Sequence, residues 1–113
     1  MNKRLVRMIW VELLFAPFVL LFNTQARAQG DAASLYKTKC AACHGDDGKG
    51  DTATGKKLGA RDFASPEVQN ETDAQLIEIT AKGKNKMPGY EKSLKDSQIK
   101  DFVAYIRELA RKK

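Results

Sequence analysis

Cys40-Ala41-Ala42-Cys43-His44 is the stretch of this 113-residue chain that predicts its fold. Two thiols three residues apart lie on nearly one side of a helical turn, and a histidine directly follows the second thiol. This C-x-x-C-H spacing matches the pattern by which a haem is attached covalently. The thiols add to the two vinyl groups of the porphyrin, and the histidine reaches the iron from the same face. The sequence therefore predicts one covalent haem c held by Cys40 and Cys43, with His44 as an iron ligand.

Closely spaced cysteines also serve three other kinds of site. A thioredoxin-like dithiol requires a βαβ context, and no strand pattern precedes Cys40. A disulfide between Cys40 and Cys43 would close a very small loop and would stabilise the fold little. A zinc site needs a fourth ligand, and residues 29–113 contain no further Cys or His. The haem interpretation is therefore favoured over all three.

Residues 1–28 predict a secretory signal peptide rather than a part of the fold. Three positive charges within residues 1–7 precede the mostly apolar residues 8–22, and Ala26-Arg27-Ala28 has the small-x-small pattern of a cleavage site. An uncleaved membrane anchor is the alternative. However, residues 8–22 are fewer than the roughly 20 apolar residues that span a bilayer. We therefore expect cleavage after Ala28, a periplasmic location and no stable membrane insertion afterwards.

Residues 29–113 are expected to form one small domain. The whole chain carries 20 basic and 14 acidic residues, a net charge of +6, but 16 and 13 of these fall within residues 29–113. The resulting balance of +3 excludes a strongly basic nucleic-acid binder, and two cysteines exclude a disulfide-rich scaffold. Leu, Ile, Val and Phe make up only 13 of these 85 residues. A domain so small and so poor in apolar residues is expected to need a cofactor to complete its core.

Three patterns predict helices and none predicts a strand, so the expected fold class is all-α. The patterns cover Asp31–Cys43, Asp73–Lys82 and Asp96–Lys112. Thr72 and Gln75 match a capping box at the start of the second helix. The third carries apolar residues at the spacing of an amphipathic stripe.

The segment Gly45–Glu71 holds five glycines and shows little periodicity. Within it, Ser65-Pro66 predicts the start of a short extra helix, with Ser as the cap and Pro at the first position. A loop this long in a compact domain is typical of a segment that wraps something functional.

Met87 is the only methionine in residues 29–113, and it lies in Lys86-Met87-Pro88-Gly89 after the second predicted helix. A lone Met often fills space in a core, which is the alternative here. The following proline restricts the loop, and a rigid loop suits a weak thioether ligand. The sequence therefore favours Met87 as the second axial ligand of the iron.

With these residues in view, the chain resembles the monohaem class I c-type cytochromes, nearest the small bacterial members with a short loop before the methionine. The resemblance covers nearly all of residues 31–111. It implies a cytochrome c fold, in which three main helices surround the haem. It also implies thioether bonds from Cys40 and Cys43, with His44 as the proximal and Met87 as the distal axial ligand. The first and last helices are expected to cross, with Tyr36 and Tyr105 packing at the crossing.

The sequence departs from this family near the proximal histidine. Many members have a proline a dozen or so residues past it, whose neighbourhood accepts a hydrogen bond from the ring, but Lys57-Leu58-Gly59-Ala60 contains none. We expect a backbone carbonyl near Gly59 to accept the His44 N–H instead. Arg61 and Tyr90 are candidates to contact the haem propionates, and solvated or loop-packing roles are the alternatives.

These expectations predict electron transfer rather than enzymatic catalysis. An iron with both axial positions filled has no open position for a substrate, and a thioether ligand raises the reduction potential. We expect a monomeric one-electron carrier that docks transiently, guided by charge, onto redox enzymes such as a terminal oxidase. The lysines expected to rim the exposed haem edge are Lys82, Lys84, Lys86, Lys92 and Lys95; an ordinary solvated surface is the alternative.

Two other functions stay open from the sequence. If Met87 binds weakly or dissociates, the open iron could take a gas or peroxide. The domain could also be the haem subunit of a larger dehydrogenase, with the same haem chemistry but a fixed partner. Binding of CO by the reduced protein and co-purification with a dehydrogenase would distinguish these functions.

Overall fold

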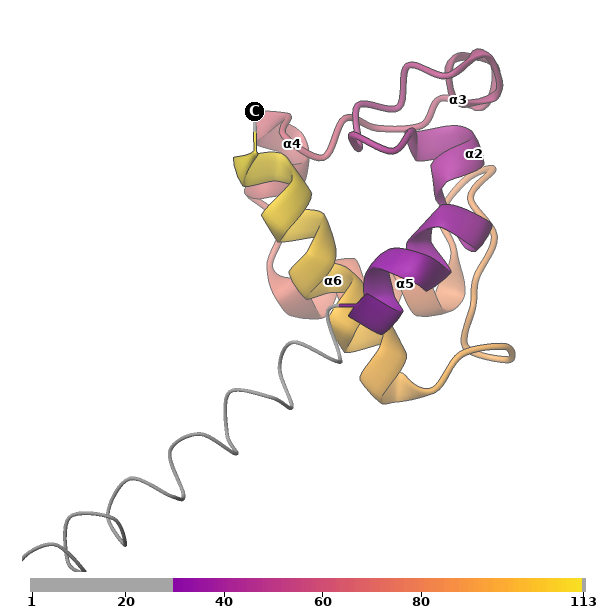
Figure 1. Ribbon diagram of the computed structural model, residues 1–113, viewed down its shortest axis with the longest axis vertical. Coiled ribbons are helices and arrows are strands. Elements are labelled where there is room, and N and C mark those ends of the chain that lie inside the picture. The colour runs from indigo at the N-terminus through magenta and orange to yellow at the C-terminus, as the bar shows by residue number, and fades with distance from the viewer. Residues whose placement is uncertain (1–29, 113) are drawn as a thin grey trace, which may run out of the picture. The chain divides into compact units, whose positions relative to one another are not determined.

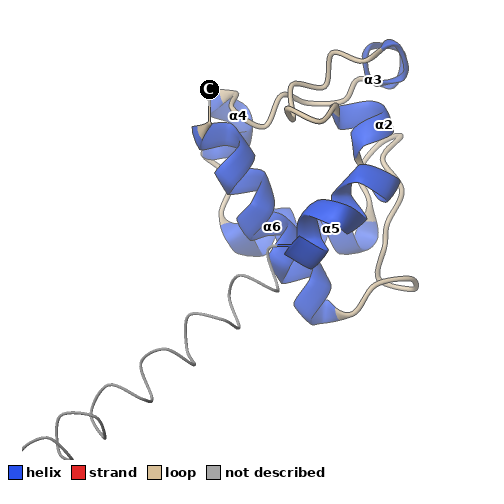
Figure 2. Cartoon of the chain, in the orientation of Figure 1, coloured by secondary structure: helices blue, strands red, loops and turns tan. Residues whose placement is uncertain are grey.

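The computed structural model of the chain describes residues 30–112, so the expected signal peptide lies outside the described residues. Within that range the chain forms helices and loops, and the only β pairing is an isolated bridge between Lys84 and Met87 (Figure 2). The all-α prediction is confirmed. No helix among residues 30–112 is both long enough and apolar enough to cross a membrane.

The helices follow one another along the chain and surround a central region (Figure 1). Residues 30–39 are helical and are followed by α2 (Ala41–His44), α3 (Ala53–Leu58), α4 (Pro66–Gln69), α5 (Asp73–Lys82) and α6 (Asp96–Arg111). The bounds of α5 agree with the prediction, and α6 ends one residue earlier than predicted.

The prediction of one unbroken helix over Asp31–Cys43 is wrong. The chain turns at Cys40, which has φ −120° and ψ −36°, and α2 begins at the next residue. The Cys40 carbonyl accepts hydrogen bonds from the N–H groups of both Cys43 (3.2 Å) and His44 (2.9 Å). This shared acceptor tightens the turn and sets the C-x-x-C-H motif apart from the helix before it.

The start of α5 follows from side-chain capping. The Thr72 hydroxyl accepts from the Gln75 N–H at 3.2 Å, and the Gln75 side chain accepts from the Thr72 N–H at 2.7 Å. Both halves of the predicted capping box are therefore present. The helix ends at Gly83, whose φ of 84° favours glycine.

The glycine-rich segment Gly45–Glu71 contains two short helices. The predicted one is α4, which begins with Pro66 after a Ser65 cap. The other, α3, is not predicted, because most of its side chains are exposed and it has no apolar stripe. Its cap is Thr52, whose hydroxyl accepts from the Gly55 N–H at 2.8 Å.

A small core joins the first helix, α4, α5 and α6. Tyr36 and Tyr105 pack with ring centroids 5.2 Å apart, so residues 30–39 and α6 meet as expected. Ala32 is buried on the same helix as Tyr36, and α5 packs against α6. The buried apolar residues are Ala32, Tyr36, Phe63, Val68, Leu76, Leu94, Ile99, Phe102, Val103 and Leu109.

Candidate haem-binding site

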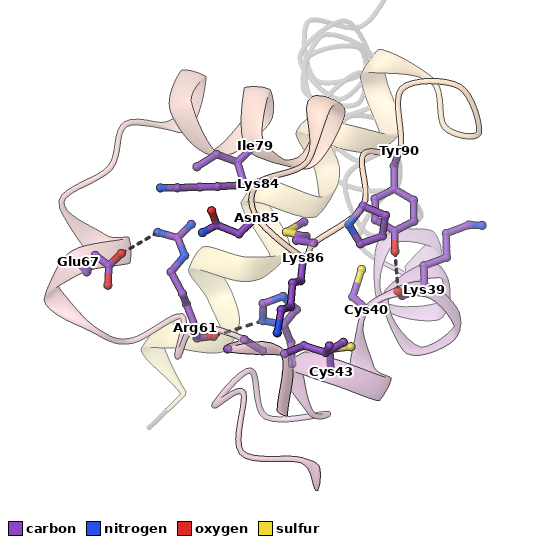
Figure 3. Close-up of a pocket in the computed structure, with 16 residues that line it drawn as sticks. Lys39, Cys40, Cys43, Arg61, Glu67, Ile79, Lys84, Asn85, Lys86 and Tyr90 are labelled. Carbon is purple, nitrogen blue, oxygen red and sulfur yellow. Dashed lines mark hydrogen bonds and ion pairs between the residues drawn. The ribbon is translucent and has the colours of Figure 1, made fainter. Parts of the chain in front are cut away.

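A cavity of about 310 Å³ brings together the four residues singled out from the sequence: Cys40, Cys43, His44 and Met87 all line it. Figure 3 shows Cys40 and Cys43 at one edge of this cavity and Arg61 at the opposite edge. The two thiols and the imidazole come from the C-x-x-C-H turn. The thioether comes from the loop after α5.

A smaller cavity of about 50 Å³ adjoins the first, since Cys40, His44 and Met87 line both. Its wall is mostly apolar and comes from α4, α5 and α6. The apolar residues that these helices contribute are Val68, Leu76, Ile79, Phe102 and Ile106. The core therefore opens onto the site, which explains how a chain with few large apolar residues can form a core around a bound group.

The His44 ring is oriented by a backbone carbonyl. Its Nδ1 lies 3.2 Å from the carbonyl oxygen of Arg61. A carbonyl can only accept, so Nδ1 carries the proton and the lone pair is left on Nε2. A backbone carbonyl near Gly59 was expected to accept the His44 N–H, and the acceptor is the carbonyl of Arg61, two residues further on.

The His44 ring also stacks on Phe63, with centroids 4.5 Å apart and planes 21° from parallel. Burial lowers the pKa of His44, against the opposing effect of its bond to the Arg61 carbonyl. The imidazole is therefore neutral at neutral pH, which is the form that binds a metal.

Residues at and before the start of α3 hydrogen-bond to the carbonyls of the C-x-x-C-H turn. The Thr52 hydroxyl lies 2.8 Å from the Ala42 carbonyl and 3.0 Å from the Cys43 carbonyl, and the Gly50 N–H donates to the His44 carbonyl at 2.9 Å. A Cβ at Gly55 would lie 2.1 Å from the Cys43 carbonyl oxygen, so no side chain fits there. These contacts satisfy the carbonyls at the end of α2 and fix the direction in which the motif faces.

The Cys40 thiol does not have the character of a redox-active thiol. Burial, as the main cause, raises the pKa of the Cys40 thiol to about 11, whereas reactive dithiols need a lowered pKa. Among residues 30–112, no three His, Cys, Asp or Glu side chains gather as a metal-holding group. The dithiol and zinc alternatives are thus disfavoured by the geometry as well as by the sequence.

Met87 is presented by a tight four-residue turn. Lys84 and Met87 exchange two backbone hydrogen bonds, of 3.1 and 3.0 Å. Asn85 follows Lys84 with φ 54°, a left-handed conformation that Asn tolerates better than most residues. This turn was not predicted from the sequence, although an Asn soon after a helix-ending glycine is a usable signal.

The loop beyond Met87 is tied back onto the end of α5. The Tyr90 N–H donates to the Thr80 carbonyl at 3.0 Å, and the Glu91 N–H donates to the Ala81 carbonyl at 3.1 Å. A Cβ at Gly89 would lie 2.6 Å from the Ala81 carbonyl oxygen, so glycine permits this close approach. The position of Met87 therefore follows from backbone contacts on both sides of it.

The five lysines expected around the site are not equivalent. Lys84 and Lys86 line the cavity, and so does Lys39, which the sequence analysis did not single out. Lys82 forms an ion pair with Glu91 at 2.6 Å. The remaining two, Lys92 and Lys95, are exposed and do not line the cavity.

The two propionate candidates both line the cavity, and both have partners within the protein. The Arg61 guanidinium lies 3.0 Å from Glu71 and 3.4 Å from Glu67. The Tyr90 hydroxyl donates to the Lys39 carbonyl at 3.0 Å (Figure 3), as the loop-packing alternative required.

The residues present fit a covalently attached haem. Two thiols, an imidazole with a free Nε2 lone pair and a thioether face one space. The inner part of that space is walled by apolar side chains. This combination of soft and nitrogen ligands with an apolar wall suits a haem iron and its porphyrin.

Known proteins with similar sequences point the same way. The family model described as "Cytochrome C oxidase, cbb3-type, subunit III" matches residues 27–106. The chain is 30% identical to the cbb3-type cytochrome c oxidase subunit CcoP of Azospirillum brasilense, over 83% of this chain and 34% of that protein. The chain therefore spans about a third of the length of the CcoP subunits that it matches.

Smaller relatives are matched over most of their length. Cytochrome c6 of Parathermosynechococcus lividus is 32% identical over 73% of this chain and 91% of that protein. Among solved structures, the KustC0563 c-type cytochrome superposes with a TM-score of 0.64 and 34% identity, covering 69% of this chain and 95% of that chain. The chain therefore belongs to the cytochrome c family, in the group described by the cbb3 subunit III model, and its cofactor is a covalently bound haem c.

Proposed function

We propose that this protein is a periplasmic one-electron carrier whose haem is attached through Cys40 and Cys43 and ligated by His44 and Met87. The observation that carries the proposal is the single cavity lined by all four side chains. The bound haem supplies the exchange of one electron between ferric and ferrous iron. The task of the polypeptide is to keep the same two ligands in place in both oxidation states.

On the proximal side, the Arg61 carbonyl holds the proton of His44 on Nδ1 and fixes the plane of the ring. Phe63 covers one face of that ring. A neutral, immobile imidazole keeps its lone pair available for the iron without rearrangement.

On the distal side, the turn from Lys84 to Met87 and the close approach of Gly89 to α5 restrict the thioether. Restriction matters because a thioether is a weak ligand that stays bound only when its backbone is held. If His44 and Met87 both bind the iron, no position would remain for a substrate, so we propose a carrier rather than an enzyme.

Docking onto redox partners is proposed to be transient and guided by charge. Lys39, Lys84 and Lys86 line the cavity and are exposed, so they would supply positive charge beside a bound haem. Partners of the terminal-oxidase type with an acidic docking surface fit this arrangement. Raising the ionic strength should slow electron transfer to such a partner, and a rate independent of salt would contradict charge-guided docking.

The export step and the oligomeric state belong to the same proposal. Cleavage after Ala28 would release a monomeric domain into the periplasm. Mass spectrometry of the exported protein, together with size-exclusion chromatography, tests both. A mature chain that retains residues 1–28 would contradict the cleavage.

The decisive experiment is Met87→Ala in the protein matured with covalent haem. We expect the variant to lose the weak red absorption band that marks methionine sulfur on ferric iron, and to bind CO rapidly when reduced. Thr38→Ala is the control, because Thr38 is exposed and does not line the cavity. If the reduced wild type binds CO as fast as Met87→Ala does, the iron is open and the carrier proposal fails.

The thioether bonds are tested separately, by extraction with acid and acetone. Haem that is extracted in this way would contradict the roles of Cys40 and Cys43.

A fixed-partner haem domain is the second candidate, and the match to CcoP favours it, since that protein is an oxidase subunit. The haem ligands would be the same in this case. Stable co-purification with an oxidase or a dehydrogenase at high salt would support this candidate and contradict transient docking.

A further inference from the structure

Glu71 lies in the short link between α4 and α5, and it contacts two cations of the site without lining the cavity itself. Its Oε1 lies 3.0 Å from the Arg61 guanidinium and 3.7 Å from the Lys84 ammonium. The side chain is only 17% exposed. Its other oxygen, Oε2, is buried and has no hydrogen-bond partner among the described residues.

The backbone of Glu71 is anchored by α6. The Arg107 guanidinium donates to the Glu71 carbonyl at 2.5 Å, and the same nitrogen lies 3.0 Å from the Asp73 carboxylate. Arg107 also reaches the carbonyls of Val68 and Gln69 at the end of α4. The backbone of Glu71 is therefore held in place, while its carboxylate contacts Arg61 and Lys84, which line the cavity.

Of the two cations that Glu71 contacts, Arg61 is hydrogen-bonded to His44 through its backbone, and Lys84 lies in the turn that carries Met87. The carbonyl of Arg61 accepts the Nδ1–H of His44. The backbone of Lys84 exchanges both of its hydrogen bonds with Met87. One carboxylate thus links the residue that orients the proximal ring to the residue that closes the distal turn.

We propose that Glu71 is a positioning residue for the iron site. Its carboxylate fixes Arg61, whose carbonyl orients His44, relative to Lys84, whose turn carries Met87. The inference rests on the proposed ligation by His44 and Met87. The ion-paired carboxylate would thus restrict the loop that accepts the His44 hydrogen bond, as a proline near residue 59 would do.

The ion pair between Arg61 and Glu71 is partly buried, so it can fix the position of Arg61. Arg61 is 24% exposed, so its bond to Glu71 is only partly screened by solvent. The second carboxylate at Arg61, Glu67, is 69% exposed and lies farther away at 3.4 Å, so it constrains Arg61 little. The hydrogen bond from Arg61 also lowers the pKa of Glu71 and keeps the carboxylate charged at neutral pH.

The test compares Glu71→Gln, which removes the charge, with Glu71→Asp, which keeps the charge but withdraws it by one methylene. Both are made in the full chain matured with covalent haem. The readouts are the red band of the ferric protein and the rate at which the ferrous protein binds CO. That rate scales with the fraction of molecules in which Met87 has left the iron. Glu108→Gln on α6 is the control, because it removes an ion pair with Lys112 and neither residue lines the cavity.

We expect both Glu71 variants to lose part of the red band and to bind CO at least about threefold faster than wild type. The control should match wild type. If Glu71 acted only through its charge, Glu71→Asp would behave as wild type, and the positioning role would be overturned. Unchanged CO rates in both variants would overturn it as well.

Two further outcomes are distinguishable. If the wild type itself lacks the red band, the proposed ligation fails and takes this inference with it. If Glu71→Gln does not mature, Lys84→Gln tests the contact on the Met87 side alone; the Lys84 side chain is 47% exposed, so its replacement should not prevent folding. Faster CO binding by Lys84→Gln supports the link, and an unchanged rate overturns it.

Discussion

Tyr36→Phe removes a single oxygen atom and tests how the first helix holds the loop behind the C-x-x-C-H turn. The Tyr36 hydroxyl donates to the carbonyl of Gly45, the residue after His44, at 2.6 Å, and its side chain is 1% exposed. The ring packs against Tyr105 and Phe63 at centroid distances of 5.2 and 6.3 Å. Phenylalanine keeps those ring contacts, so the substitution isolates the hydrogen bond.

The size of the effect follows from what the Gly45 carbonyl retains. A typical hydrogen bond contributes about 1 kcal/mol net, and a buried acceptor left without a partner costs about 1–3 kcal/mol. Gly45 keeps one long bond, from the Gly48 N–H at 3.3 Å, so the lower part of that range applies. We expect the free energy of unfolding to fall by about 1.5 kcal/mol. At about 4–8 °C per kcal/mol for a domain of this size, the Tm should fall by roughly 6–12 °C.

The assay is guanidinium and thermal unfolding of the covalent holoprotein, followed by far-ultraviolet circular dichroism. Thr38→Ala is the matched control, since it removes an exposed hydroxyl that donates to the Leu35 carbonyl at 2.9 Å on the same helix. The control should lose no more than about 0.5 kcal/mol, as for other exposed substitutions. If Tyr36→Phe costs no more than the control, the buried bond to Gly45 does not hold the loop.

Acid stability and the distal turn give two more predictions. Arg61 lowers the pKa of Glu71 below its usual value of 4.5, so the stabilisation by Glu71 is present above about pH 4.5 and is lost as the pH falls through the lowered pKa. The difference in unfolding free energy between wild type and Glu71→Gln should therefore vanish at the acid end of a pH series; a constant difference would contradict this. Asn85 has φ 54°, so Asn85→Val should lower the unfolding free energy by about 1–2 kcal/mol, whereas Asn85→Gly should not, and the reverse order in denaturant midpoints would contradict the turn.

The features that the sequence predicted correctly depend on local patterns. The capping box at Thr72 and the apolar stripe of Asp96–Lys112 lie within single helices, where spacing alone determines which side chains meet. The C-x-x-C-H turn and Met87 could be paired across 43 residues only because few other residues among residues 29–113 could ligate an iron. The structure places them around one cavity.

The features that the sequence did not predict depend on backbone groups or on long-range contacts. The partner of His44 is the carbonyl of Arg61, which every residue possesses, so no residue type marks it. Phe63 stacks on His44 from a loop without periodicity. Glu71 is an ordinary carboxylate in the sequence, and its two cations lie 10 residues before it and 13 residues after it. The break at Cys40 is also invisible locally, since Asp31–Cys43 reads as one helical pattern.

The backbone around His44 has more contacts with the rest of the protein than the backbone around Met87. His44 lies in α2, whose end is braced by α3, whereas Met87 lies in a turn whose two middle residues are exposed. That same turn carries Lys84 and Lys86, two of the three lysines at the cavity.

Replacing Lys84 therefore changes the docking charge and also breaks a contact with Glu71, so a slower electron transfer would have two causes. Lys39 separates them. It lies on the helix before Cys40, lines the cavity, and contributes to the Tyr90 contact only through its carbonyl, which any substitution retains. If charge guides docking, Lys39→Gln should reduce the salt dependence of the rate and leave CO binding unchanged. Faster CO binding in this variant would mean that the charge of Lys39, and not only the backbone of the turn, contributes to the proposed binding of Met87 to the iron.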